Sequence, residues 1–153
     1  MVKIVKTGNS YTITEVGENS NASYLSNFVG VWSGSDMWGP TQIETSLVDG
    51  VLQITGVGVK FMEDGWGEEI LDMQTLPLNV NICTGEFSIS ESYYMETLYG
   101  GAVQDKYYLS GTGTLDLDTL TMDLQYDFVQ GGTSYVDWLT PYGYVFHEIV
   151  TLN

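Results

Sequence analysis

Eighteen glycines divide this 153-residue chain into short segments in which polar and apolar residues alternate. In the clearest segment, residues 120–129, every even position from Leu120 to Phe128 is apolar and the positions between them are polar. Such a period of two places successive side chains on opposite faces of a β-strand. No apolar pattern with helical spacing persists for more than about two turns. The chain is therefore predicted to be all-β, with one buried and one solvated face on each strand.

Tight-turn signals between these segments predict a series of antiparallel hairpins. Asp-Gly is among the strongest short-range signals for a two-residue hairpin turn, and other pairs containing glycine act in the same way. The last two predicted strands are separated by a turn with proline and glycine. The predicted neighbours are 42–48 and 51–63 over Asp49-Gly50, 76–83 and 86–90 over Thr84-Gly85, 107–118 and 120–129, and 133–139 and 142–152.

Two glycines point to the apolar face of the predicted strand 107–118. Gly111 and Gly113 share the parity of Leu115 and Leu117. Glycine inside a strand weakens it and marks a close backbone approach, a bulge or a bend where a sheet curls on itself. About eight to ten strands are counted along the chain, which is the size range of a small barrel. We therefore expect an antiparallel up-and-down β-barrel.

The first 25 residues differ from the rest of the chain. Residues 3–7 and 10–16 are predicted to pair as a small hairpin over Gly8-Asn9. The expected division is therefore an N-terminal hairpin and linker at 1–25 and a barrel domain at 26–153. The N-terminal part is either an accessory hairpin of this fold or the tail of a preceding domain.

The passage into the barrel is predicted to hold little regular structure. Residues 17–23 are polar and rich in turn formers, so they are expected to be a linker. The segment 23–28 is short enough for one helical turn that closes a barrel end, with Ser23 as its candidate N-cap.

The charge of the chain restricts the partners that it can bind. Twenty acidic side chains face four lysines and no arginine, which gives a formal net charge of −16. Such a field repels nucleic acid and anionic lipid headgroups, and without arginine there is no bidentate clamp for carboxylate or phosphate. No segment approaches the ~20 apolar residues of a membrane-spanning helix. We therefore expect a neutral or cationic small ligand, no nucleic acid and no membrane insertion.

The predicted barrel opens on a short motif. Gly30-Val31-Trp32 follows the predicted helical turn at 23–28 and begins a strand. From residue 26 to residue 153 the chain resembles lipocalin-like (calycin) barrels, in which a Gly-x-Trp lies at the start of the first strand. The resemblance implies that Trp32 closes the base of the barrel and that Gly30 lets the backbone pass closely.

The chain departs from lipocalins proper in two respects. It has no arginine to pack over the tryptophan and no Thr-Asp-Tyr motif, so a divergent branch is expected. The segment 111–116 and the composition rich in Tyr and Gly are similar to lipocalin-like domains of Gram-negative cell-envelope lipoproteins. This similarity implies a secreted or cell-envelope location, in the periplasm or on the outer membrane, with an export signal that this sequence does not contain. It also implies other domains or envelope proteins as partners.

Residues suited to catalysis are sparse. His147 is the only histidine and is expected to be a partly buried, hydrogen-bonded side chain in the last strand. No Gly-x-Ser-x-Gly nucleophile motif accompanies it. A glycosidase needs two suitably spaced carboxylates, and no pair among the twenty acidic residues stands out. The protein is therefore expected not to be an enzyme and to use no cofactor.

The sequence offers little to a metal ion. Cys83 is the only cysteine and is expected to be a near-core thiol, because free cysteine is among the most buried residue types. The acidic loop 63–69 and the pair Asp116-x-Asp118 supply oxygen ligands suited to calcium, but neither has the spacing of an EF-hand loop. Polar turns are the expected role of both, and no metal site is predicted.

The aromatic residues are the strongest lead to function. Trp38, Trp66 and Trp138 lie in or beside turns that contain Gly, Pro or Asp, where a core ring is less expected than inside a strand. Tyr99 and Tyr142 adjoin similar turns with glycine. Exposed flat rings suit stacking on sugars or closing over an apolar ligand; otherwise each ring plugs an open end of the barrel. These five residues are the candidate ligand-binding residues.

The expected function is a non-catalytic extracytoplasmic binding module for a neutral ligand. The ligand would be a glycan or a small apolar molecule, held by aromatic residues at the barrel mouth. The alternative is a structural or interaction domain of a larger surface lipoprotein without any ligand site. A glycoside hydrolase is the third choice.

Overall fold

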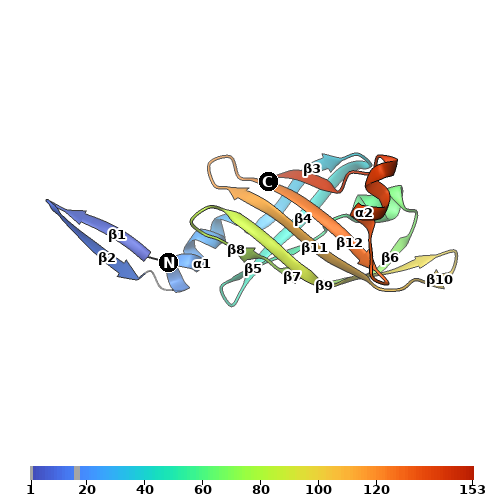
Figure 1. The fold of residues 1–153 in the computed structure, drawn as a ribbon, viewed down its shortest axis with the longest axis horizontal. Coiled ribbons are helices and arrows are strands. Elements are labelled where there is room, and N and C mark those ends of the chain that lie inside the picture. Colours follow the sequence, from blue (N-terminus) through green and yellow to red (C-terminus); the bar gives the residue numbers. More distant parts are fainter. Residues whose placement is uncertain (1, 16–17) are drawn as a thin grey trace.

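The computed structural model describes residues 2–15 and 18–153, which form one twelve-stranded antiparallel sheet and a separate hairpin (Figure 1). The all-β class is confirmed, with more strands in the sheet than the eight to ten predicted. The large sheet consists of β3 (Gly30–Asp36), β4 (Gly39–Val48), β5 (Val51–Thr55), β6 (Glu69–Met73), β7 (Leu76–Pro77), β8 (Asn79–Val80), β9 (Glu86–Tyr99), β10 (Ala102–Val103), β11 (Tyr107–Asp116), β12 (Thr121–Gln130), β13 (Thr133–Ser134) and β14 (His147–Leu152). The helical elements are α1 (Glu18–Leu25), η1 (Ser26–Phe28), the π-helical turn η2 (Phe61–Gly65), α2 (Tyr135–Leu139) and η3 (Thr140–Tyr142). Among the described residues, no helix is long and apolar enough to cross a membrane.

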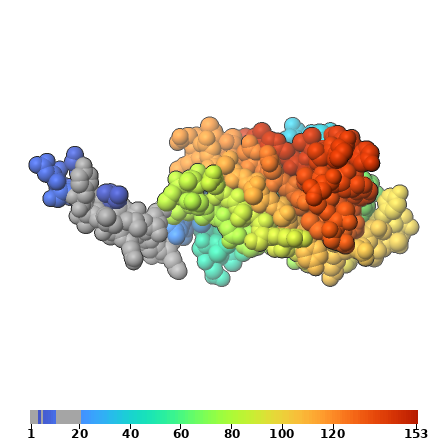
Figure 2. Space-filling view, in the orientation of Figure 1, coloured from blue at the N-terminus to red at the C-terminus, as the bar shows by residue number. Residues whose placement is uncertain are grey.

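The large sheet curls around the core. Its strands follow the order β10-β9-β11-β12-β14-β3-β4-β5-β7, so the C-terminal strand lies between β12 and β3. The short segment 76–80 connects the two sides of the curl, because β7 pairs with β5 and β8 pairs with β9. The resulting shape is barrel-like, with α1 near one end and α2, β6 and β10 near the other (Figure 1). In the space-filling view of Figure 2, the yellow β9–β10 hairpin and the red C-terminal region lie at the same end.

The predicted hairpins are confirmed where the turn signal is strong. β4 and β5 meet at Asp49 and Gly50, whose φ angles of 50° and 77° suit a two-residue hairpin turn with both residues left-handed. β8 pairs with β9 across the predicted Thr84-Gly85 turn. β11 and β12 pair from end to end, with Tyr107 opposite Gln130.

The predicted strand 133–139 is wrong beyond its first two residues. Only β13 is extended, and the chain then turns into α2. Ser134 is the N-cap of α2, and its Oγ accepts a 3.1 Å hydrogen bond from the backbone N–H of Asp137. Tyr135 and Leu139, four residues apart, are buried on one side of the helix. The cap and this burial together outweigh the alternating pattern of a short segment.

The predicted strand 51–63 ends early, with β5. Gly56 and Gly58 have φ angles of 94° and 71°, which glycine adopts without strain, and they redirect the chain into the barrel. The turn η2 follows and buries Phe61 completely. We call residues 56–66 the plug, because they fill the barrel interior near the α2 end.

The predicted N-terminal hairpin is confirmed. It consists of β1 (Val2–Thr7) and β2 (Ser10–Glu15), paired in a sheet of their own with Thr7 opposite Ser10. Figure 1 draws this hairpin outside the curled sheet, beyond α1.

The predicted linker 17–23 is helical where it is described. Helix α1 begins at Glu18, so Ser23 lies inside the helix and not at its N-cap. The helix leads into η1, which buries Phe28 in the core. In α1 itself, burial of Leu25, which is 6% exposed, favours the helix although the preceding polar residues have weak helix propensity. Residues 16–17, which belong to the predicted strand and linker, lie outside the described residues.

Trp32 lies in the hydrophobic core near the start of β3. Its ring is fully buried and stacks on Phe28, with 6.4 Å between ring centroids. Its Nε1 donates a 2.9 Å hydrogen bond to Oγ1 of Thr45, and that hydroxyl donates to the carbonyl oxygen of Phe28. Gly30 has a φ of 146°, and a Cβ there would lie 3.0 Å from the side chain of Leu152. One threonine hydroxyl therefore ties the first barrel strand to the helical turn before it.

Cys83 is exposed, so the expectation of a near-core thiol is wrong. It lies in the turn before β9, where the N–H groups of Thr84 and Gly85 donate to the carbonyl oxygen of Asn81. The N–H of Cys83 donates to the Asn81 side chain at 3.0 Å. A surface turn held in this way leaves the thiol in solvent, whatever the usual burial of cysteine.

The two glycines of β11 lie at a point of close packing. The pairing of β9 with β11 shifts register between Leu109 and Gly111, as in a β-bulge. A Cβ on Gly113 would overlap the carbonyl oxygen of Asp123 and the ring of Phe87. The absence of a side chain here allows the neighbouring strand and ring to approach.

Gly113→Ala is therefore expected to lower the free energy of unfolding by about 1–3 kcal/mol, the usual cost of overpacking a core. Denaturant unfolding measures the difference. Thr114→Ala, an exposed neighbour on the same strand, is the control and should change stability by less than about 0.5 kcal/mol. Equal stability of Gly113→Ala and the wild type would contradict the close approach.

Candidate functional site

A pocket, which we call the mouth pocket, lies at the barrel end near α2, β6 and β10. Its volume is about 480 Å³. The plug, the residue before β6, the β9–β10 hairpin and the segment after it, the end of β12 and α2 all contribute to it. It is lined by the rings of Trp66, Tyr99, Tyr135 and Trp138 and by the polar side chains of Glu68, Gln104 and Gln130.

Two tryptophans form a corner of the mouth pocket. Trp66 ends the plug, where its backbone N–H donates a 2.7 Å hydrogen bond to the carbonyl oxygen of Phe61. Trp138 lies on α2, and its ring meets that of Trp66 at an angle of 83° with 5.4 Å between centroids. Tyr135 packs edge-on against Trp138 at the same distance. Trp138 is still 47% exposed, so much of its ring is free to contact a ligand.

The floor of the mouth pocket is polar. Glu68 is only 6% exposed and accepts hydrogen bonds from the hydroxyls of Thr97 at 2.6 Å and Tyr107 at 2.8 Å. The Tyr135 hydroxyl donates to Gln130 at 2.7 Å and lies 3.2 Å from the Tyr107 hydroxyl. A carboxylate offers about four lone-pair sites. Glu68 therefore retains the capacity to accept a hydrogen bond from a ligand.

The two tyrosine hydroxyls at the floor remain protonated. Burial raises the pKa of Tyr107, and its hydrogen bonds to Tyr135 and Glu68 raise the pKa further. Burial also raises the pKa of Tyr135. Both hydroxyl groups at the floor are therefore neutral at physiological pH.

The structure brings together some of the predicted ligand residues and separates others. Three of the five line the mouth pocket, namely Trp66, Tyr99 and Trp138. Trp38 does not line it: this ring is half-buried and packs on Phe61, with 5.1 Å between centroids. Tyr142 is 74% exposed on η3 and does not line the mouth pocket.

Sequence reasoning did not identify Glu68, Gln130 and Tyr135. Glu68 was considered only as part of the acidic loop 63–69, and its neighbours gave no sign that it would be buried. Tyr135 is brought beside Trp138 by α2, which the capping pattern of Ser134 and Asp137 could have revealed. Gln130 is the last residue of β12, and only the helix that follows it defines its neighbours.

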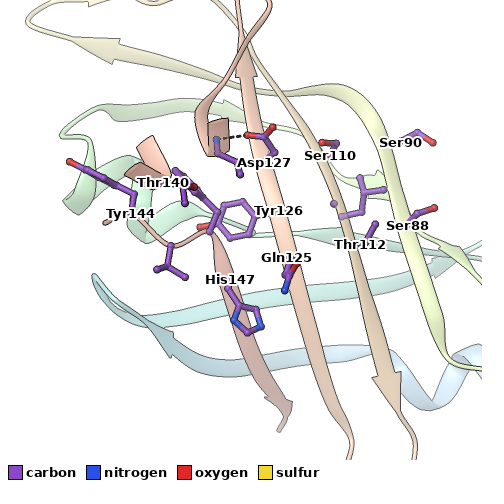
Figure 3. Close-up of a pocket in the computed structure, with 15 residues that line it drawn as sticks. Ser88, Ser90, Ser110, Thr112, Gln125, Tyr126, Asp127, Thr140, Tyr144 and His147 are labelled. Atoms are coloured by element: carbon purple, nitrogen blue, oxygen red, sulfur yellow. Dashed lines mark hydrogen bonds between the residues drawn. The ribbon is translucent and has the colours of Figure 1, made fainter. Parts of the chain in front are cut away.

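A second hollow, the outer groove, lies on the outside of the sheet (Figure 3). Its volume is about 660 Å³. Strand register places Ser88, Thr112, Gln125 and His147 in one row across β9, β11, β12 and β14. His147 is half-buried and lies 2.6 Å from the carboxylate of Asp123, which confirms the hydrogen-bonded histidine expected in the last strand. A polar row is what alternation predicts for the solvated face of these strands, so the groove requires no ligand to explain it.

A second buried carboxyl group lies inside the barrel. Glu148 on β14 is 1% exposed, and its Oε1 accepts a 3.1 Å hydrogen bond from the backbone N–H of Gly58 in the plug. Burial raises the pKa of Glu148 to about 7, and the charge of Asp36 acts in the same direction. Within the described residues, the other oxygen of Glu148 and the hydroxyl of Tyr126 have no hydrogen-bond partner. Glu148 thus anchors the plug at an electrostatic cost.

The acidic loop 63–69 is not organised as a metal site. Asp64 pairs with Lys60 at 3.0 Å, and Glu68 bonds to hydroxyl groups. Across residues 2–15 and 18–153, no group of three or more His, Cys, Asp or Glu side chains is placed to hold a metal ion.

No protein-family model, curated protein or solved structure matches this chain. The mouth pocket is therefore interpreted from its own geometry and chemistry.

Proposed function

We propose that this protein is a non-catalytic binding module whose mouth pocket holds a neutral ligand, and that this ligand is a glycan in preference to a small apolar molecule. One observation carries the proposal. The rings of Trp66 and Trp138 meet at 83° beside a pocket whose floor holds the buried carboxylate of Glu68.

The pairing of flat rings with a polar floor suits a sugar. A sugar has apolar C–H faces that pack on aromatic rings and hydroxyl groups that donate hydrogen bonds. A sugar hydroxyl that points toward Glu68 could donate a hydrogen bond to a carboxylate lone pair that Thr97 and Tyr107 do not occupy. A wholly apolar ligand offers Glu68 no hydrogen-bond donor, so it would gain nothing from the polar floor.

The charge of the protein supports a neutral ligand. With a formal net charge of −16 and no arginine, the chain repels anionic ligands and lacks a bidentate clamp for them. Glu68 is the only acidic residue among those that line the mouth pocket. Glycoside hydrolysis ordinarily uses two carboxylates, so binding is preferred over catalysis.

The location and family that we propose follow the sequence resemblance. We infer a divergent lipocalin-like barrel from an extracytoplasmic setting, attached to other domains or envelope proteins. Its support is the buried Trp32 at the start of β3, directly after the helical turn η1. The competing proposal, a scaffold domain without a ligand, would leave the exposed part of Trp138 without a role.

Trp66→Ala and Trp138→Ala are each expected to weaken glycan binding at least about tenfold, or 1.4 kcal/mol. Tryptophan fluorescence is recorded while neutral oligosaccharides and lipids are titrated into the wild type, and calorimetry repeats the positive titrations with the variants. Tyr142→Ala is the matched control, because it removes a 74% exposed ring that does not line the mouth pocket. If no member of the panel changes the fluorescence, the scaffold role is favoured. If all three variants lose affinity equally, the ligand binds elsewhere.

A further inference from the structure

The mouth pocket has a neighbour, which we call the side pocket. The side pocket has a volume of about 540 Å³ and shares Gln130, Tyr135 and Trp138 with the mouth pocket. Its own lining comes from the passage between β13 and α2. The two hollows therefore adjoin at Trp138, the most exposed tryptophan ring at this end of the barrel.

The side pocket offers polar groups that the fold does not use. Ser134 is engaged, because it caps α2 and donates a 2.6 Å hydrogen bond to Asp127. The side chains of Thr133 and Asp137 are exposed and make no hydrogen bond within the described residues. A hydroxyl and a carboxylate are thus available to bind the hydroxyl groups of a ligand.

Packing holds the shared ring in a fixed orientation. Trp138 meets Trp66 at 83° and Tyr135 at 85°, each with 5.4 Å between centroids. A ring held by two neighbours loses little further freedom when a ligand binds, which favours affinity. The ring can therefore contact a ligand that extends from one hollow into the other.

We propose that the mouth pocket and the side pocket are adjoining subsites for one neutral oligosaccharide of at least two units that crosses Trp138. The inference rests on the proposed glycan function and specifies the ligand class. In the mouth pocket, one unit packs in the corner of the tryptophans and donates a hydroxyl to Glu68. In the side pocket, the next unit binds Thr133 and Asp137. A second linked unit binds with a high effective concentration, so affinity rises with chain length.

The test compares chain lengths. Cello-, malto- and manno-oligosaccharides of one to four units are titrated calorimetrically into the wild-type protein. At least one series is expected to bind at least about tenfold more tightly as a disaccharide than as its monosaccharide. An affinity that is the same for one unit and for two, with binding still lost in Trp66→Ala, would overturn the two-subsite inference and leave the single glycan site intact.

Variants of the side pocket test whether the higher affinity for the disaccharide arises there. Thr133→Val and Asp137→Ala are expected to remove most of the advantage of the disaccharide and to leave monosaccharide affinity unchanged. Asp118→Ala, an exposed carboxylate in the β11–β12 turn, is the control for loss of charge. If the advantage of the disaccharide survives both side-pocket variants, the inference is wrong. If no series binds at all, the inference falls together with glycan binding, and the fluorescence panel then decides whether any ligand is held.

Discussion

Replacing Glu148 with glutamine is expected to stabilise the protein by about 3 kcal/mol above pH 7 and to have little effect below pH 4.5. Glutamine has the same shape and keeps an oxygen for the 3.1 Å hydrogen bond from Gly58. It removes the charge that the barrel interior does not solvate. The gain at high pH is the cost of the buried carboxylate in the wild type.

The direction follows from proton binding. The folded state binds a proton at Glu148 up to about pH 7, whereas the unfolded chain releases that proton near pH 4.5. Between these values the folded state carries more protons, so this group makes the protein less stable as pH rises. This loss of unfolding free energy is complete above pH 7 and is absent below pH 4.5. Half-buried Asp36, whose pKa is also raised by partial burial, acts in the same direction.

Urea unfolding of the wild type and Glu148→Gln at several pH values between 4 and 8.5 measures the difference. Glu44→Gln, which removes an exposed carboxylate on β4, serves as the control for net charge and should show no such trend. A stability difference that is independent of pH would show that the charge of Glu148 is not the cause. A less stable glutamine variant at pH 8 would mean that the plug requires the carboxylate.

Trp32→Ala is expected to lower the free energy of unfolding by about 3–5 kcal/mol, the usual cost of removing a large buried ring. The ring is fully buried, and its loss would leave a cavity beside Phe28. The hydroxyl of Thr45 would also lose the 2.9 Å hydrogen bond from the indole nitrogen. A change of this size is a large share of the stability of an ordinary domain.

Trp32→Phe separates the two contributions and keeps the test measurable if the alanine variant does not fold. It retains a ring against Phe28 and loses the hydrogen bond, so a smaller loss of about 1–3 kcal/mol is expected. Trp138→Ala is the comparison, because that ring is 47% exposed. Denaturant unfolding followed by far-ultraviolet circular dichroism orders the three variants. The outcome that contradicts the central role of Trp32 is a Trp138→Ala protein that is equally destabilised.

Local patterns in the sequence predicted the strands better than the segments that leave the sheet. Asp49-Gly50 and the alternation in 120–129 need no distant partner, and both appear in the structure as predicted. The plug begins as a plausible continuation of β5. It departs because Gly56 and Gly58 turn it toward rings from remote strands. A side chain at position 58 would not fit, since an added Cβ would lie 2.6 Å from the ring of Phe128. Such tertiary packing has no local signal.

The same distinction applies to the aromatic residues. Trp38 and Trp66 have similar flanking turns, so both were predicted to bind a ligand. Phe61 of the plug packs against both, yet only Trp66 reaches the mouth pocket. Turn composition predicted that rings would gather near the end of the barrel, and the path of the plug decided which of them line a pocket.

The alternating pattern of the last strand bears on the buried carboxyl group of Glu148. If His147 shares a face with exposed Val145 and Ile149, then Glu148 shares the opposite face with buried Phe146 and Val150. Parity groups Glu148 with Phe146 and Val150, but Val145 and Ile149 make the opposite face apolar too, so the sequence reasoning did not identify Glu148 as buried. Its partner was not predictable, since Gly58 lies 90 residues earlier in the chain.

The segment 76–80 has a mechanical consequence. Along this side, two residues pair with β5 and two with β9, and the N–H groups of Leu78 and Asn81 add hydrogen bonds to Leu52 and Glu86. By contrast, β11 and β12 pair from end to end over ten residues each. One of the four paired residues in 76–80 is Pro77, which has no N–H to donate. Few backbone hydrogen bonds mean a low free energy of local opening. We therefore expect β5 and β9 to separate first along the segment 76–80. Transient access to the hydrophobic interior would come through this opening, remote from the rings of Trp66 and Trp138.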